Sequence, residues 1–295
     1  MKNKNLLFLS LVFLLLGLLA VPTRVWTRKN ATNIDTMRAS RLSPVIMIPG
    51  SSATVNRFDP LVKLLNQGLP KNKRHSILKM KVYNSGKIIS SGSLRKGDNE
   101  PIIVVGFENN HDGYVNIKKQ SKMFAKAFNL LTKTYKFNNF KALGHSNGGL
   151  IYTAFLENYY APYSNDIKVT KLMTIGSPYN FDEQSDTKKT QMLTDFIKKS
   201  SKLPKSLVVY SVAGTENYSS DGLVPIQSVQ AGKYIYQKKV KSFMEITVTG
   251  VNAQHSSLPQ NKQIVRLIKQ YMLKRNNKGD FLRRQDNDKI SDEKL

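Results

Sequence analysis

The sequence predicts an α/β fold with a mostly parallel central sheet and helices on both faces. Strand-like apolar runs alternate with helical patterns between residues 44 and 275, and this alternation is typical of parallel sheets with helical crossovers. Polar or glycine-containing loops follow several of the strand-like runs, at the sheet edge where open α/β folds bind their ligands. The 40% hydrophobic composition and the absence of cysteine indicate a globular domain that depends on its core rather than on disulfides.

The first part of this pattern contains a strand, a helix and a second group of strands. The run Pro-Val-Ile-Met-Ile at 44–48 is short and apolar, as in a buried strand, and it ends at Pro-Gly. Leucine and valine at helical spacing predict a helix over 58–68. Strand pieces are expected over 77–83 and 87–89, around an Asn-Ser-Gly turn, followed by a strand over 101–105.

The middle of the pattern continues the alternation. A long amphipathic helix is predicted over 119–135, because its apolar residues recur near helical spacing. A strand over 140–143 and a helix over 149–159 follow, and then a strand over 169–175 that leads into Gly-Ser-Pro-Tyr. A polar stretch after it contains one short helical pattern at 192–197.

The last part supplies two more strands and a closing helix. The runs at 206–212 and 243–250 are rich in residues that favour strands, and the first ends at Ala-Gly. An amphipathic helix is predicted over 262–275. The sequence shows no internal repeat, so we expect a single domain over 44–275.

A Gly-x-Ser-x-Gly pentapeptide lies between a strand and a helix of this pattern. Its residues are Gly144, His145, Ser146, Asn147 and Gly148. α/β-Hydrolases present a nucleophilic serine at such an elbow, where small residues two before and two after it let the backbone pack closely. The pentapeptide by itself also fits an ordinary turn, so its interpretation depends on the other residues that the chemistry requires.

Two further residues continue the order serine, acid, histidine that these enzymes show. Asp221 lies in the polar loop after the strand at 206–212, and His255 follows the strand at 243–250. His255 would take the proton of Ser146 and return it to the leaving group, while Asp221 would hold the imidazole. Two neighbouring strands therefore supply an acid and a base.

Each of these assignments has an alternative. Asp221 precedes a glycine and could be a turn residue, in which case Glu216 in the same loop is the rival acid. His255 could be a surface histidine before a helix, although no other histidine follows Asp221. His145 fits a packing or hydrogen-bonding neighbour of the nucleophile. Because no cysteine or paired-histidine motif is present, we expect no metal site and no cofactor.

An acyl-transfer enzyme also needs hydrogen-bond donors for the oxyanion. The backbone N–H of Asn147, directly after the serine, is one candidate. The N–H of Ser51 is the second, because Gly50 after the first strand lets the backbone turn toward the site. A strand that ends in Pro-Gly also fits an ordinary turn.

These features together resemble the α/β-hydrolase superfamily. More narrowly, the chain resembles a family of exported, largely uncharacterised cell-surface hydrolases of Gram-positive bacteria. The matching segments extend over about residues 44 to 272, and they are 45–50 with the Phe-Asp pair at 58–59, 144–149, 220–225 and 255–259. The resemblance implies an α/β-hydrolase fold with a small cap and a serine nucleophile.

The same resemblance implies the roles of the site residues. Ser146, Asp221 and His255 would be nucleophile, acid and base, and the N–H groups of Ser51 and Asn147 would form the oxyanion hole. Relatives commonly have His-Gly where this chain has Pro-Gly at 49–50, which changes what lines the pocket there. The fold itself does not define a substrate, because it hosts many chemistries.

Four residues are candidates for the walls of a pocket: Pro49, His145, Tyr179 and Leu223. The segment after Tyr179, up to about residue 204, occupies the position where this fold commonly carries a cap. A surface crossover helix is an equally good interpretation of that segment. Leu223 could instead pack the acid loop.

The first 27 residues predict a signal peptide or a membrane anchor. Lysines at positions 2 and 4 precede an almost purely apolar run over 6–21, as in export segments. The run is intermediate in length between a secretory core and a membrane span, and the poor cleavage motif and Trp26 favour an anchor. We expect residues 28–43 to be a linker and the catalytic domain to lie outside the cell, anchored or secreted.

The charge balance predicts negatively charged partners. The chain has 46 basic and 20 acidic residues and a net charge of +26. For an exported protein, an anionic membrane or cell-envelope surface accounts for this charge without specific nucleic-acid recognition. The charged, apolar-poor stretch at 276–295 predicts a disordered tail.

The sequence therefore predicts an exported serine hydrolase that cleaves carboxylic esters of a small-molecule or lipid-like acyl substrate. A thioesterase or amidase of the same fold is one alternative. A cationic envelope-binding protein with little catalysis is another, from a different class.

Overall fold

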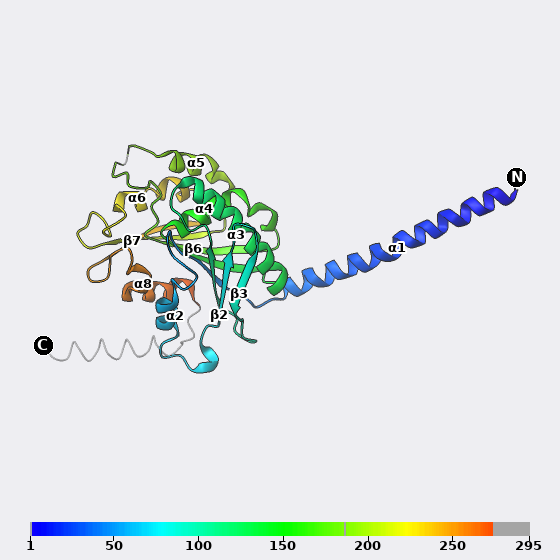
Figure 1. Cartoon of the computed structure of the whole chain (residues 1–295), viewed down its shortest axis with the longest axis horizontal. Coiled ribbons are helices and arrows are strands. Elements are labelled where there is room, and N and C mark those ends of the chain that lie inside the picture. Colours follow the sequence, from blue (N-terminus) through cyan, green and yellow to red (C-terminus); the bar gives the residue numbers. More distant parts are fainter. Residues whose placement is uncertain (1, 186, 274–295) are drawn as a thin grey trace.

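The computed structural model describes residues 2–185 and 187–273. The predicted tail at 276–295 lies outside the described residues. Within them, one α/β domain carries a long helix at its amino end, α1 (Lys2–Arg38), which extends away from the domain (Figure 1). The α/β architecture expected from the sequence is confirmed.

In the described part of the chain, eight strands form one sheet in the order β3-β2-β4-β1-β5-β6-β7-β8. Their bounds are β1 Val45–Ile48, β2 Ile77–Val82, β3 Ile88–Gly92, β4 Ile102–Phe107, β5 Asn139–His145, β6 Lys168–Ile175, β7 Val208–Thr215 and β8 Ser242–Thr249. All neighbours pair in parallel except β2 and β3, which form an antiparallel hairpin. The mostly parallel sheet is thus confirmed, and its strands end at a common edge.

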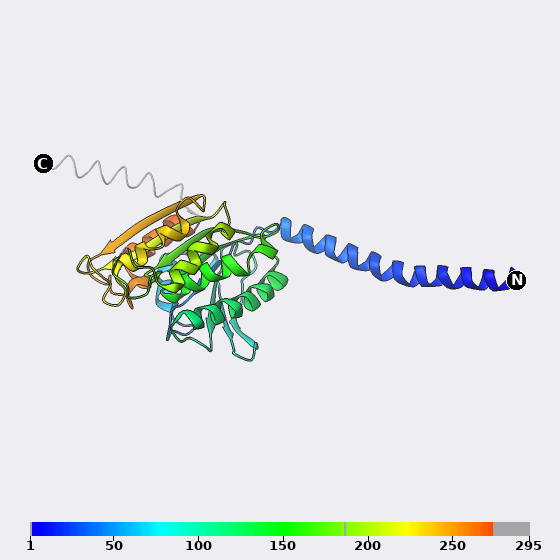
Figure 2. The same cartoon turned by 90° about the horizontal axis from the view of Figure 1, so that it is seen from above.

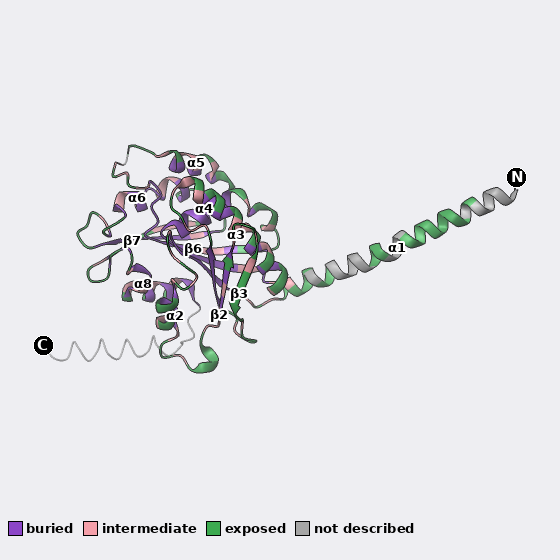
Figure 3. Ribbon diagram, in the orientation of Figure 1, coloured by how far each residue is buried: buried purple, intermediate pink, exposed green. Residues whose placement is uncertain are grey.

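Helices cover both faces of the sheet. One face carries α3 (Tyr114–Tyr135), α4 (Asn147–Asn158), α5 (Gln191–Lys199) and α7 (Lys233–Tyr236), and the other carries α2 (Asp59–Asn66) and α8 (Lys262–Leu267). Strand β1 shows how the sheet separates two cores: Ile46 and Ile48 pack with the first group, whereas Val45 and Met47 pack with the second. Successive strand residues point to opposite faces, so a fully apolar strand contributes to both cores. Buried residues gather in the central strands of the sheet, such as β6 and β7 (Figure 3).

Several helix boundaries differ from the sequence prediction. Helix α3 begins at Tyr114, one turn and more before the expected start at 119, after a glycine at 113 with positive φ. The closing helix changes after Leu267 into a π-helical turn over Ile268–Met272. Two short helices, α6 (Ile226–Gln230) and α7, were not predicted, because segments of four and five residues carry too little periodicity.

The segment between β6 and β7 contains α5. This helix buries Met192, Leu193 and Phe196 and contacts α4 and α7. Thr190 caps the start of α5: its hydroxyl accepts the Leu193 N–H at 3.3 Å, as threonine commonly does at helix N-termini. The segment expected to form a small cap thus contributes one short helix that packs on the α4 side of the sheet, as the alternative of a crossover helix also predicted.

Helix α1 contains the apolar run that predicted an export segment. It continues without a break through residue 27 to Arg38, so residues 28–38 are helical where a linker was expected. Its described apolar side chains between Phe8 and Leu18 are exposed, and a second view shows the helix leading away from the domain as well (Figure 2). Among the described residues, no helix combines the length and hydropathy required to cross a membrane.

Candidate active site

Ser146 lies at a tight turn between β5 and α4. Its backbone has φ 53° and ψ −128°, a strained conformation for a residue with a side chain. Three glycines make the turn possible, because a Cβ at Gly144, Gly148 or Gly149 would collide with neighbouring atoms. A Cβ at Gly148 would lie 2.0 Å from the Ile48 carbonyl oxygen, and one at Gly144 would lie 2.4 Å from the Gly149 nitrogen. The turn has the geometry of the elbow that the pentapeptide predicted.

The backbone of Ser146 is anchored on the neighbouring strand. Its N–H donates to the Ile175 carbonyl at 2.8 Å, and its carbonyl accepts the Ser177 hydroxyl at 2.8 Å. Ser177 was not identified from the sequence, where it is only part of Gly-Ser-Pro. Its buried hydroxyl helps to keep the strained turn in one position.

Asp221 and His255 are in direct contact. The Nδ1–H of His255 donates to Asp221 Oδ2 at 2.7 Å. The other carboxylate oxygen, Oδ1, accepts the N–H groups of Leu223 at 3.1 Å and Val224 at 2.7 Å. Because Nδ1 holds the proton, Nε2 of His255 carries the lone pair that a general base needs. Glu216 is exposed and makes no contact with His255.

The Asp221–His255 pair packs against a glycine at the end of β6. A Cβ at Gly176 would lie 3.1 Å from Asp221 Oδ2 and 3.2 Å from His255 Nδ1. Gly176 also has a positive φ of 57°, which L side chains seldom adopt. Glycine at 176 therefore leaves space for the hydrogen bond between the acid and the base.

His145 connects the serine turn with the histidine loop. Its ring lies 4.8 Å from the ring of His255, centroid to centroid. Its Nε2–H donates to the His255 backbone carbonyl at 3.0 Å, and a carbonyl can only accept, so the tautomer is defined. Burial, together with the nearby His255 and Arg57, lowers the pKa of His145 well below its usual value. His145 is therefore a neutral donor that supports the backbone of His255.

The contact between His145 and His255 places His255 near the serine turn. The ring of His255 lies at a tilt of 37° to that of His145, the residue directly before Ser146, and no direct hydrogen bond joins Ser146 Oγ to His255 Nε2. Such bonds are often long without substrate and shorten when it binds. The site thus contains a preformed acid–histidine pair beside a strained serine.

Two backbone donors lie beside Ser146. A Cβ at Gly50 would be only 2.6 Å from the Ser146 Cβ, so the loop after β1 passes very close to the serine. Parallel pairing with Ile48 opposite Gly144 brings the two strand ends together. Among the described residues, the N–H groups of Ser51 and Asn147 have no hydrogen-bond acceptor. Backbone N–H groups without an acceptor are uncommon in folded proteins, so both remain available as hydrogen-bond donors beside Ser146.

Arg57 and Asp112 contact the site residues, although no sequence pattern predicted them. The Arg57 guanidinium donates to the Ser256 carbonyl and, at 3.4 Å, to Gln260 Oε1, so it holds the loop after His255. Asp112 Oδ1 accepts the side-chain N–H of Asn147 at 2.8 Å. Both contacts join residues far apart in the chain, which local patterns do not reveal.

The four candidate pocket residues lie in different environments. Pro49 and His145 are buried beside the serine, and Tyr179 is fully buried with its hydroxyl 3.2 Å from that of Tyr236. Leu223 is 67% exposed at the outer end of the acid loop. None of the four lines either of the two cavities, of about 580 and 220 Å³, that lie near α3.

With this geometry established, the chain can be compared with known proteins. Residues 33–275 match the model of a family described as alpha/beta hydrolase of unknown function (DUF915). The chain belongs to this α/β-hydrolase family. A comparison with curated proteins found no significant match.

Two of the solved structures that resemble this chain are similar to it over most of its length. A protein from Lactobacillus plantarum WCFS1 that is described as a cell surface hydrolase is 55% identical, with a TM-score of 0.74, over 84% of this chain and 97% of that one. The lin2722 gene product from Listeria innocua is 28% identical, with a TM-score of 0.71, over 80% of this chain and 96% of that one. These likenesses confirm the resemblance seen in the sequence and the α/β-hydrolase fold.

Proposed function

We propose that this α/β-hydrolase is an exported serine esterase that cleaves carboxylic esters through an acyl-enzyme on Ser146. The observation that carries the proposal is the buried Asp221–His255 pair, with its 2.7 Å hydrogen bond, beside the strained serine turn. A serine hydroxyl needs an adjacent base to become an effective nucleophile. This arrangement supplies the base in the required tautomer.

The proposed reaction has two steps. In the first, His255 Nε2 takes the proton of Ser146 Oγ while the oxygen attacks the ester carbonyl; the C–O bond to the alcohol then breaks, and His255 returns the proton to the leaving alcohol. In the second, His255 takes a proton from water, whose oxygen attacks the acyl-enzyme and releases the carboxylic acid and Ser146. Asp221 stays ionised and stabilises the imidazolium in both steps.

The unused N–H groups of Ser51 and Asn147 would stabilise the negative oxygen of the tetrahedral intermediates. Donors fixed in advance cost no reorganisation when charge develops, and losing one such donor typically reduces kcat by about 10² to 10³-fold. Gly50 is essential to this role, because any side chain there would collide with Ser146.

Export is the second part of the proposal. The relative from Lactobacillus plantarum is described as a cell surface hydrolase. The exposed apolar side chains of α1 support membrane targeting of this segment, and the net charge of +26 supports retention near an anionic envelope surface. Protease accessibility in intact cells tests it: the domain is degraded from outside if it is exported and protected if it is not.

A fluorophosphonate probe tests the chemistry directly, because it forms a covalent bond only with an activated serine. We expect labelling of the full chain at Ser146, identified by mass spectrometry of the modified peptide. Ser146→Ala should abolish the label, whereas Ser164→Ala, at an exposed serine outside the site, should leave it unchanged. Labelling at another serine, or no labelling of a folded protein, contradicts the proposal.

A thioesterase or amidase would use the same residues, and relative rates on matched oxygen ester, thioester and amide substrates distinguish the three. An envelope-binding protein without catalysis is the alternative that the charge favours. Salt-sensitive binding to cell envelopes that is unchanged by Ser146→Ala, in a protein without probe labelling, would support that alternative.

A further inference from the structure

The larger of the two cavities near α3 is not lined by Ser146, but its wall includes the loop that contacts the serine turn through Asp112. It has a volume of about 580 Å³, within the range of small-molecule sites. Its walls come from the β2–β3 turn, the loop between β4 and α3, and α3 itself. We call it the basic cavity, and its polar lining includes Asn84, Asn109, Asn116, Lys119, Lys122 and Lys126.

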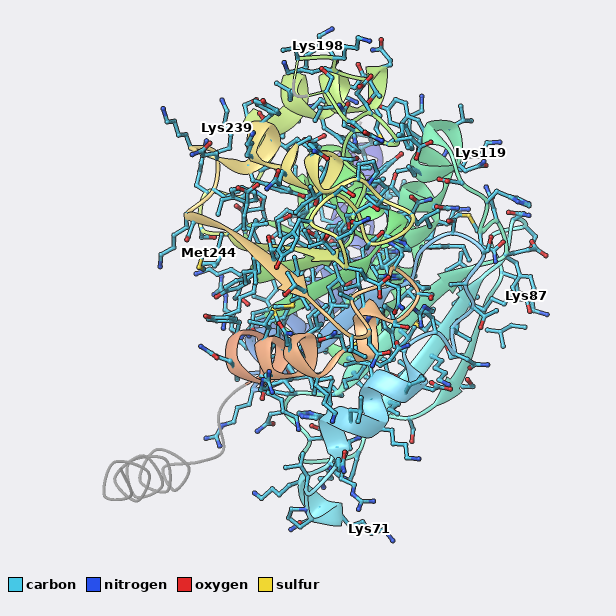
Figure 4. The ribbon with its side chains drawn as sticks, turned by 90° about the vertical axis from the view of Figure 1, so that its left-hand side faces the viewer. Lys71, Lys87, Lys119, Lys198, Lys239 and Met244 are labelled. Atoms are coloured by element: carbon cyan, nitrogen blue, oxygen red, sulfur yellow. The ribbon has the colours of Figure 1, made fainter. Side chains whose placement is uncertain are left out.

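Three lysines of α3 give the cavity its charge. Lys119, Lys122 and Lys126 recur at helical spacing, so they lie along one face of the helix. None of them has a carboxylate within salt-bridge distance in the described part of the chain. Figure 4 shows Lys119 on the same side of the domain as Lys87 of the β2–β3 turn. The positive charge on this wall is therefore not neutralised internally.

The β2–β3 turn closes the other side of the cavity. The Lys126 ammonium reaches this turn, since a Cβ at Gly86 would lie 2.9 Å from it. One carboxylate, Glu108, also lines the cavity, and it accepts the backbone N–H of Asn84 at 2.7 Å. The cavity thus has three ammonium groups and one carboxylate, and that carboxylate is already hydrogen-bonded to the backbone. This excess of positive charge is suited to an anion.

The loop between β4 and α3 is held rigidly between the cavity and the serine turn. The buried Gln120 amide donates to the carbonyls of Asn109 and His111, at 2.8 and 2.9 Å. On the cavity side, Asn109 Nδ2 donates to Asn116 Oδ1 at 3.1 Å. On the other side, Asp112 binds the Asn147 side chain. One short loop thus connects the cavity with the residue after Ser146.

The same loop also touches the backbone beside the proposed oxyanion donor. The Ser52 N–H donates to the Asn110 carbonyl at 2.7 Å, and Asn110 Nδ2 donates to the Ala53 carbonyl at 3.2 Å. The wall of the cavity is therefore joined by hydrogen bonds to the segment that carries Ser51.

We infer that the basic cavity binds a phosphate-bearing, hydroxyl-rich ligand and serves as the polar subsite of the substrate. Ammonium groups bind phosphate through charge-assisted hydrogen bonds, and side-chain amides can donate to and accept from hydroxyl groups. Its use as a substrate subsite rests on the proposed esterase function, whereas phosphate binding does not. A phosphorylated polyol ester matches both the cavity and the serine chemistry.

Calorimetric titration with sn-glycerol 3-phosphate tests the binding. The full chain carries Ser146→Ala, so that no turnover interferes. We expect binding that is about tenfold tighter than that of glycerol, because glycerol lacks the phosphate, and that weakens as salt is raised. Failure of glycerol 3-phosphate to bind more tightly than glycerol overturns the inference.

Two matched triple variants distinguish binding in the basic cavity from general electrostatic attraction. Lys119→Gln, Lys122→Gln and Lys126→Gln together should weaken binding about tenfold or more. Lys63→Gln, Lys168→Gln and Lys205→Gln remove the same charge from exposed lysines elsewhere and should change it less than about twofold. Equal weakening in both triple variants means nonspecific attraction and overturns the inference. All six side chains are exposed, so both proteins should fold.

Two further ligands identify the source of the phosphate. Tighter binding of dihexanoyl phosphatidylglycerol than of glycerol 3-phosphate would assign a lipid headgroup, and tighter binding of a glycerol phosphate trimer would assign a soluble polymer; both support the inference. With Ser146 restored, the cavity variant should lose activity on a phosphate-bearing ester but keep it on p-nitrophenyl acetate. Phosphate binding in a protein inactive on every ester would refute the esterase proposal alone.

Discussion

Asp221 and Glu157 are both buried carboxyl groups, 1% and 3% exposed, but their surroundings are opposite. Asp221 accepts hydrogen bonds from His255 and from two backbone N–H groups. Glu157, on α4, has no hydrogen-bond partner for either oxygen within the described part of the chain. Burial raises its pKa to about 9, against the weaker opposing effect of Lys199 and Lys202. One buried carboxyl is thus surrounded by donors and the other is a neutral acid at pH 7.

This difference shows that burial alone does not make a carboxyl group useful for catalysis. A buried charge is costly unless donors replace the water that it loses. The loop around Asp221 supplies those donors from the backbone of Leu223 and Val224, close in sequence. Helix α4 supplies none to Glu157, since its own backbone groups already bond within the helix. The two carboxyl groups therefore differ in ionisation because the loop at Asp221 offers backbone donors and the helix at Glu157 does not.

The largest effect is expected from Asp221→Asn. An amide at this position keeps the size of the side chain but presents an N–H to His255 Nδ1, which favours the wrong tautomer. We expect kcat for ester hydrolysis to fall by about 10⁴-fold. Glu216→Gln, in the same loop, is the matched control and should leave kcat unchanged. The reverse result would assign the acid to Glu216.

His145→Phe should have the next largest effect, because it removes the donor that supports the His255 backbone. A lost buried hydrogen bond of about 1 to 3 kcal/mol predicts a roughly tenfold or larger fall in kcat with little change in KM. His145→Gln offers an N–H in a similar place and should restore part of the rate. If both variants lose activity equally, packing rather than the hydrogen bond explains the role of His145.

Glu157→Gln should change stability rather than rate. The unfolded chain loses the Glu157 proton near pH 4.5, whereas the folded chain keeps it up to about pH 9. Wild-type stability therefore falls as pH rises through this window. The glutamine variant lacks this dependence, so its melting temperature should exceed that of the wild type by roughly 10 °C or more at about pH 8.5 and match it near pH 4.5.

The difference between the two melting curves is the informative quantity, because other titrating groups affect both proteins alike. Parallel curves across the window would mean that Glu157 is ionised in the folded state. Ester hydrolysis by Glu157→Gln should equal that of the wild type, which separates this carboxyl from Asp221.

Asp112→Ala should have the smallest effect. Its carboxylate is exposed, and Oδ1 accepts the side-chain N–H of Asn147 at 2.8 Å and the backbone N–H of Gly113 at 2.7 Å. Exposed hydrogen-bonded charges contribute little, about 1 kcal/mol or less, so we expect a fall in kcat of a few fold. Asp166→Ala, at an exposed carboxylate far from the site, should have no effect. A loss as large as that of Asp221→Asn would require a direct role in the reaction.

The sequence predicted Asp221 but not Glu157 for a physical reason. The position of Asp221 follows from chain order and from a strand that ends in a polar loop, both visible in one dimension. The environment of Glu157 depends on α3 and α5, which meet α4 only in the folded domain; Lys118 and Phe196 line the same small cavity. Arg57 and Asp112 escaped prediction for the same reason, because their contacts join distant segments.

For the fold as well, local features were predictable and features that depend on long-range contacts were not. Hydrophobic periodicity located most strands and the long helices, and the α/β-hydrolase architecture is confirmed. The spatial order of the strands is a property of long-range pairing and was not predicted. Neither were α6 and α7, whose few residues are ordered by contacts around β7 and α5. The roles of Ser146, Asp221, His255, Ser51 and Asn147 stay predictions.

The most direct test of the account is the hydrolysis of p-nitrophenyl esters, from acetyl to long acyl chains, by the full chain and by Ser146→Ala. We predict turnover by the wild type with a clear optimum in acyl length, and loss of essentially all of it in the variant. Hydrolysis that persists in Ser146→Ala, or no hydrolysis of any ester by the folded wild type, would contradict the assignment of Ser146 as the nucleophile of an esterase.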